Sequence, residues 1–149
     1  MSDPRFGAVP HGGTTIMSGR QDVIRMDKIT KVYRSGPIEV AALRSVDLTI
    51  RSGEMIAVIG PSGSGKSTLM NLMGCLDVPS DGVYEFEGRD IARLSPEELA
   101  DLRNHSIGFV FQSFHLLPYA TARENVEMPL LFAGLPSRAR RERAMEMLG

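Results

Sequence analysis

The sequence predicts an α/β fold in which a parallel sheet core follows an N-terminal antiparallel β layer. Residues 23–33 and 46–50 alternate between apolar and polar side chains, which is typical of half-buried strands. Residues 55–59 form a continuous apolar run followed by a glycine-rich stretch and a helical pattern. A second apolar run at 107–111 provides another strand for the sheet core.

The length and composition indicate one globular domain without a strong electrostatic partner. The chain has 149 residues, of which 42% are hydrophobic, and its 17 basic and 18 acidic residues give a formal net charge of −1. This balance does not favour a nucleic-acid partner. Cys75 is the single cysteine, which excludes an internal disulfide, fits a reducing compartment and is expected to be a small packed residue.

The N-terminal segment and the apolar stretches bear on localisation. Residues 1–21 are rich in Gly, Pro, Ser and Thr and lack the apolar core of a signal peptide, so we expect a disordered leader before a domain at 22–149. The longest uncharged apolar stretch, 128–135, is far shorter than the roughly 20 residues that cross a bilayer. We therefore expect no direct membrane insertion.

The first elements are two strands joined by a turn. The turn cluster at 34–37 separates the strand at 23–33 from the alternating strand at 46–50. A second turn at 52–54 leads into 55–59, where a continuous apolar run predicts a strand that is buried on both faces of a parallel sheet. The two layers of the expected fold thus follow each other directly.

The next elements are a helix and a short strand. Helix formers at 67–73 predict a helix that ends at Gly74. The turn residues at 79–82 precede a strand at 83–86, which Gly88 closes. The helix therefore starts where the glycine-rich stretch ends.

The C-terminal third is predicted to be mainly helical. Ser95, followed by Pro96 and Glu98, reads as a capping box that opens a helix to about residue 104, ahead of the strand at 107–111. Thr121 and Glu124 form a second capping box for a helix over 122–132, which Pro129 is expected to bend or interrupt. Ser137 is expected to cap a basic helix at 138–148.

A phosphate-binding loop lies between the predicted strand at 55–59 and the following helix. Its residues fit the pattern G-x-x-x-x-G-K-[ST] and are Gly60, Pro61, Ser62, Gly63, Ser64, Gly65, Lys66 and Ser67. Glycines let successive N–H groups converge on one anion, and the helix adds its positive N-terminal end. Lys66 is expected on the β and γ phosphates of ATP and Ser67 on Mg²⁺, with Thr68 beside them.

Stretches around the loop resemble ABC transporter ATP-binding subunits over nearly the whole chain after residue 22. Residues 29–33 are similar to the motif whose aromatic residue stacks on adenine, which implies that role for Tyr33. Residues 108–112 resemble the family's Q-loop, so Gln112 is expected to sense Mg²⁺ and the attacking water. Residues 65–77 and 109–118 look like the branch of macrolide exporters and lipoprotein-release systems.

The resemblance implies a P-loop NTPase-type fold and a set of partners. In the family, two nucleotide-binding domains sandwich ATP head to tail, so a homodimer is expected. A separate transmembrane permease would use the energy of ATP for export. The expected localisation is cytoplasmic, peripheral to the inner face of the cell membrane.

The sequence lacks other family motifs that hydrolysis needs. There is no Leu-Ser-Gly-Gly-Gln-type signature loop, no apolar strand ending in Asp-Glu and no later switch histidine. The nearest match to the apolar-Asp element ends at Asp77, which is expected to be a surface turn residue. We therefore expect an N-terminal fragment, truncated before the sheet is complete, that binds ATP weakly and does not hydrolyse it alone.

Two alternatives remain open from the sequence. The alternatives to an ABC transporter subunit are a non-catalytic nucleotide-binding relic and another P-loop NTPase, such as a nucleotide kinase or a GTPase. A GTPase would need a guanine-reading Asn-Lys-x-Asp string, which does not occur. Thermal melting with and without Mg-ATP would identify a relic that does not bind nucleotide.

Overall fold

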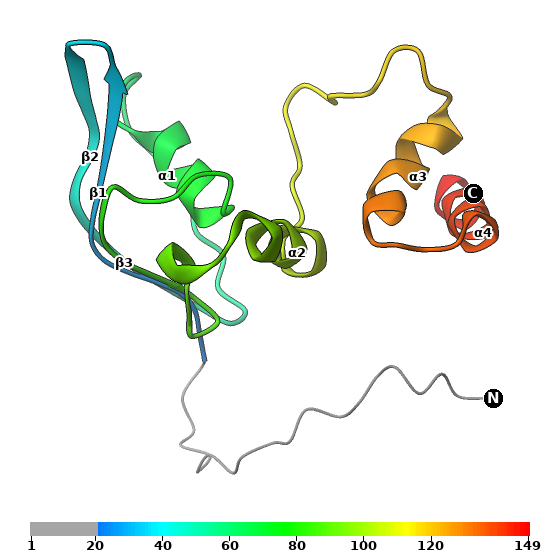
Figure 1. Ribbon diagram of the computed structural model, residues 1–149, viewed down its shortest axis with the longest axis horizontal. Coiled ribbons are helices and arrows are strands. Elements are labelled where there is room, and N and C mark those ends of the chain that lie inside the picture. Colours follow the sequence, from blue (N-terminus) through cyan, green and yellow to red (C-terminus); the bar gives the residue numbers. More distant parts are fainter. Residues whose placement is uncertain (1–20) are drawn as a thin grey trace, which may run out of the picture.

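A computed structural model describes residues 21–149 of the chain (Figure 1). The predicted leader, residues 1–21, lies outside the described residues except for Gln21. The carbonyl oxygen of Gln21 accepts a hydrogen bond from the Ser52 amide at 2.8 Å. The division into a leader and a domain therefore stays a prediction.

Four antiparallel strands form one sheet in the order β2-β1-β3-β4. The strands are β1 (Asp22–Ser35), β2 (Ile38–Arg51), β3 (Asp81–Phe86) and β4 (Arg89–Asp90). A tight turn at Gly36, with φ of 57°, joins β1 to β2. The strands predicted at 23–33, 46–50 and 83–86 are confirmed as parts of β1, β2 and β3.

Four α-helices and a short 3₁₀ helix, η1 (Ile91–Arg93), complete the described structure. The α-helices are α1 (Lys66–Met73), α2 (Pro96–Ser106), α3 (Ala122–Phe132) and α4 (Ser137–Leu148). The two predicted capping boxes are present at the starts of α2 and α3.

Two details of the C-terminal helices differ from prediction. Ser137 does not cap α4: Pro136 holds the N-cap position, and Ser137 is the first helical residue, without a side-chain cap bond. Pro136 can take this place because the N-cap amide has no partner within the helix. Pro129 does not interrupt α3, which continues to Phe132.

The core lies between the sheet, α1 and α2. It contains Ile24, Met26 and Ile29 from β1 and Tyr84 and Phe86 from β3, together with Leu43, Leu72, Cys75, Ile91 and Leu102. Figure 1 shows α1 beside the sheet and α2 next to it, while α3 and α4 form a separate pair joined to α2 by residues 107–121. The sheet and α1 therefore form the framework that positions the loop at 60–67.

The two predicted strands of the parallel core are not strands in this structure. Residues 55–59 and 107–111 have no strand hydrogen bonding, and within residues 21–149 every strand pair is antiparallel. Met55, Ile59 and Val110 are 98%, 89% and 102% exposed. A strand needs a neighbouring strand for its backbone hydrogen bonds, and the described part of the chain places none beside either segment.

Candidate functional site

The loop at 60–67 is seated against β2 by Gly65. Gly65 has φ of 88° and occupies the N-cap position of α1. A Cβ atom at this position would lie 2.6 Å from the Ala42 carbonyl oxygen and 2.9 Å from Leu43 Cδ2. Only glycine combines this backbone conformation with such a close approach, so β2 fixes where the loop ends and α1 begins.

Lys66 folds back over the loop. Its Nζ donates hydrogen bonds to the carbonyl oxygens of Gly60 at 2.9 Å and Pro61 at 2.7 Å. Ser67 is exposed and Thr68 is half-buried. The ammonium group is therefore held at the loop by two neutral acceptors, which a phosphate oxygen can replace with a stronger, charge-assisted bond.

A small cavity of about 310 Å³ opens between the loop and β2. Its walls come from β2 and the loop, and its lining residues are Val40, Ala41, Ala42, Ser62, Gly63, Gly65, Lys66, Ser67 and Thr68. The positive end of α1 and the ammonium of Lys66 face the same region. This arrangement fits an anion cradle for a polyphosphate.

A larger groove of about 780 Å³ also reaches the first turn of α1. Lys66, Ser67 and the exposed Gln112 line it together with apolar residues that include Ile56, Val58 and Phe109. Gln112 is 45 positions from Ser67 in the sequence, so the fold brings the two predicted Mg²⁺ ligands to one groove. Both contribute an oxygen atom, the donor that Mg²⁺ prefers.

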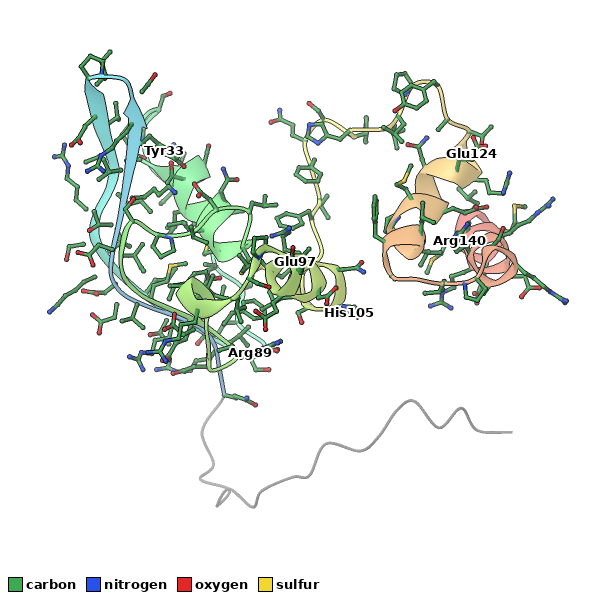
Figure 2. All side chains as sticks on the ribbon, in the orientation of Figure 1. Tyr33, Arg89, Glu97, His105, Glu124 and Arg140 are labelled. Carbon is green, nitrogen blue, oxygen red and sulfur yellow. The ribbon has the colours of Figure 1, made fainter. Side chains whose placement is uncertain are left out.

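Tyr33 lies on β1 opposite Val40, which lines the small cavity. Tyr33 itself does not line that cavity and is 41% exposed. Figure 2 labels Tyr33 on the side of the hairpin that faces α1. The β1–β2 pairing therefore places Tyr33 beside a residue of the cavity wall.

Asp77 corrects one prediction, because it is more than a surface turn residue. It accepts hydrogen bonds from Lys31 Nζ at 2.6 Å and from the Tyr33 hydroxyl at 3.0 Å. Burial raises the pKa of the Asp77 carboxyl, but hydrogen bonds from Lys31, the Val78 amide and Tyr33 outweigh burial, and the pKa lies below its ordinary value.

The sequence analysis did not predict the hydrogen bonds that join Asp77 to Lys31 and Tyr33. The spacing of Lys31 and Tyr33 indicates that they lie together, because residues two apart on a strand share one face. The contact to Asp77 spans more than forty residues and follows only from the placement of the turn after α1 beside β1.

Cys75 is a packed residue, as predicted, with 1% exposure. Its Sγ lies 3.6 Å from the hydroxyl of the buried Tyr84, which donates to the Met73 carbonyl at 2.9 Å. Burial raises the pKa of both groups. Neither group therefore ionises near neutral pH, and their role is to hold the end of α1 on β3.

Residues 21–149 bear on metal binding and on membrane insertion. They contain no group of three or more His, Cys, Asp or Glu side chains that could hold a metal ion by themselves. In the same residues, no helix has the length and apolar character needed to span a membrane. A magnesium ion here would need oxygen atoms from a ligand as well.

The chain is similar to ABC transporter proteins. The ABC transporter family matches residues 43–149. The macrolide export ATP-binding/permease protein MacB of Brucella abortus (strain 2308) is 49% identical over 126 residues, and that of Azoarcus sp. (strain BH72) is 52% identical. Each match covers 85% of this chain, which spans 20% and 19% of these relatives.

Solved structures agree with this comparison. The ATP-binding cassette MJ0796, solved as a dimer in a post-hydrolysis state bound to ADP and Pi, has a TM-score of 0.73 and 43% identity. A second dimeric structure of MJ0796, a bacterial ABC transporter cassette, has a TM-score of 0.73 and 44% identity. Each match covers 83% of this chain and 54% of the other.

These similarities confirm the P-loop NTPase type of α/β fold and the resemblance to the macrolide-exporter branch. They also remove the nucleotide kinase and GTPase alternatives, because the match covers the phosphate loop, Gln112 and the segments between them. The chain belongs to the ABC transporter family.

Proposed function

We propose that this chain binds ATP at the loop of residues 60–67, as the nucleotide-binding part of an ABC transporter that energises export through a transmembrane permease. The observation that carries the proposal is the seating of the loop on β2, with Lys66 held over it at the N-terminus of α1. The solved relative bound to ADP and Pi supports the same ligand class.

The main predicted site residues have proposed roles. Lys66 would exchange the carbonyls of Gly60 and Pro61 for the β and γ phosphates, and the loop amides would bind the remaining phosphate oxygens. Ser67 and Gln112 would supply oxygen ligands to Mg²⁺, whose bound charge neutralises the phosphates. Tyr33 would stack on the adenine.

We propose that this chain alone does not hydrolyse ATP. Neither the small cavity nor the larger groove beside the loop is lined by an Asp or Glu among the described residues. Gln112 can orient a water molecule but is not basic enough to take its proton. Binding without turnover is therefore the expected behaviour.

The partners are proposed by similarity to the family. The dimeric cassette structures support a homodimer, and the similarity to MacB supports a permease. The expectation of a separate permease subunit stays a prediction, since MacB is itself an ATP-binding/permease protein. A cytoplasmic site of action at the inner face of the membrane is proposed on the same basis.

A second candidate is a non-catalytic relic that binds nucleotide poorly or not at all. The exposed, irregular segments 55–59 and 107–111 favour it, because both border the groove at the loop. A relic of this kind would show no change in melting temperature with Mg-ATP.

Thermal melting of the chain with and without Mg-ATP tests the proposal. At a ligand concentration of 100 times Kd, binding stabilises the native state by about 2.7 kcal/mol. Lys66→Ala should abolish this stabilisation because it removes the ammonium group at the loop. Lys28→Ala, which removes an exposed lysine on β1, is the matched control and should keep the response. An unchanged response in Lys66→Ala would refute the loop as the binding site.

A further inference from the structure

The turn after α1 is joined to β1 by side chains and backbone. Residues 77–80 run beside residues 30–33: the Ser80 amide donates to the Thr30 carbonyl at 2.8 Å, and the Val32 amide donates to Ser80 Oγ at 3.0 Å. These two bonds hold the turn on the strand without any contribution from the Asp77 side chain.

Asp77 joins the two side chains of β1 that face this turn. One carboxylate oxygen accepts from Lys31 Nζ at 2.6 Å, and the other accepts from the Tyr33 hydroxyl at 3.0 Å. Lys31 also donates to the Val78 carbonyl at 2.7 Å and is only 9% exposed. The three side chains therefore restrain one another, with Asp77 at the centre.

One face of the Tyr33 ring is in contact with the Lys31 ammonium group. Lys31 Nζ lies over the ring at 5.1 Å from its centroid, within the distance of a cation–π contact. Tyr33 nevertheless keeps 41% of its surface exposed. The ring is thus held in one orientation while part of it is available to a ligand.

Helix α1 links this cluster to the phosphate loop. Its first residue is Lys66, and its last, Met73, lies four positions before Asp77. A helix of eight residues is about 12 Å long and rigid. The pairing of Tyr33 with Val40, which lines the cavity at the loop, is a second connection. The ring and the loop are therefore fixed relative to each other by two independent routes.

We infer that Asp77 is a positioning residue for the nucleotide base, holding the Tyr33 ring and Lys31 in the orientation that an adenine stacks on. This inference rests on the proposed function, since it gives Tyr33 a ligand. A ring that is already immobilised loses little rotamer freedom when the base binds, which increases affinity. Asp77 does not touch the nucleotide and contributes nothing to binding of the phosphates.

Comparison of two ligands tests the inference. Mg-ATP carries the base, whereas Mg-tripolyphosphate carries only the phosphates, and both affinities can be measured by calorimetry on the full chain. Asp77→Ala should weaken Mg-ATP by about 3- to 10-fold, the cost of ordering one side chain. The affinity for Mg-tripolyphosphate should stay within about 2-fold, because Lys66 and the loop are unchanged.

Three further variants sharpen the result. Asp77→Asn keeps an oxygen that accepts from Tyr33 and should restore part of the affinity for Mg-ATP. Tyr33→Phe keeps the ring but loses the hydroxyl bond, so its combination with Asp77→Ala should weaken Mg-ATP by less than the product of the single effects. Glu39→Gln, which breaks the nearby Arg34–Glu39 ion pair, is the matched control and should change neither affinity.

The outcomes separate the two proposals. If the unaltered chain binds neither ligand, the proposed function fails and this inference fails with it. If the unaltered chain binds Mg-ATP but Asp77→Ala weakens both ligands equally or neither, Asp77 has no part in positioning the base and only this inference is overturned. If circular dichroism shows that Asp77→Ala does not fold, Asp77→Asn takes its place in the same comparison. This inference is then overturned if Asp77→Asn binds both ligands as tightly as the unaltered chain and its effect adds to that of Tyr33→Phe.

Discussion

The residues of the loop at 60–67 divide into those that bring a side chain and those that bring only a backbone conformation. Lys66 and Ser67 offer a cation and a hydroxyl, and the sequence pattern is enough to select them. Gly63 and Gly65 have φ of 78° and 88°, but only Gly65 is also pressed against β2. The two glycines therefore have different physical reasons for lacking a side chain.

Gly65→Ala is expected to destabilise the chain by about 2–4 kcal/mol, from left-handed strain plus a clash with the Ala42 carbonyl. Gly63→Ala causes only the left-handed backbone strain, since its Cβ would meet nothing within 4 Å. It should lower the free energy of unfolding by about 1–2 kcal/mol. Urea unfolding of both variants measures the difference. Equal costs would show that Gly65 is not packed on β2 in solution.

Asp77 gives the chain a stability that depends on pH. Its folded pKa lies below the ordinary value near 4, so its contribution is present above pH 4 and is lost as pH falls through the folded pKa. Asp77→Asn should therefore lower the melting temperature at pH 7 and flatten its decline on the acid side. A variant that declines as steeply as the unaltered chain below pH 4 would assign that decline to other carboxylates.

At the scale of elements, the sequence predicted a helix or strand correctly where the residues that stabilise it lie close together in the chain. The capping boxes at Ser95 and Thr121 need only residues three positions later, and both helices begin as the sequence predicts. The hairpin of β1 and β2 pairs neighbouring segments around a short turn. Residues 55–59 and 107–111 had no such local partner, and for them the predicted strands were wrong.

The two capping boxes should differ in their effect on stability. Ser95→Ala removes the bond from the Glu98 amide and should lower the global free energy of unfolding by about 1 kcal/mol, because α2 places Leu102 in the core. Thr121→Ala removes the matching bond in α3, which has no buried residue, so it should fray that helix with less effect on global melting.

Amide hydrogen exchange together with thermal melting distinguishes these two effects. Faster exchange confined to residues 122–126, with a small change in melting temperature, is expected for Thr121→Ala. An equal loss of global stability in both variants would mean that α3 and the sheet unfold as one cooperative unit.

At the scale of the whole molecule, the core on the sheet is well formed whereas the groove at the loop is bordered by exposed apolar side chains. Leu72 of α1 is completely buried, and Val110 is completely exposed although both are aliphatic. The difference arises because α1 packs on an antiparallel sheet that residues 22–90 build by themselves. Residue 110 has no neighbouring strand in the described part of the chain.

Leu72→Ala is expected to cost about 2–5 kcal/mol, since it leaves a cavity beneath α1. Val110→Ser should change the free energy of unfolding by less than about 0.5 kcal/mol. Urea unfolding checks both values. A cost for Val110→Ser as large as that for Leu72→Ala would show that residues 107–111 are packed in solution.

The sequence by itself determined the glycine-rich loop pattern, the antiparallel layer, the starts of α2 and α3, and the family, because each depends on short-range patterns of residue type and backbone conformation. The tertiary structure decided which residues lie together: Ser67 and Gln112 line one groove, Gly65 packs on β2, and Asp77 accepts hydrogen bonds from Lys31 and Tyr33. It also decided that 55–59 and 107–111 are not strands. Apolar runs record a tendency to be buried, but burial and pairing require partners that are distant in sequence.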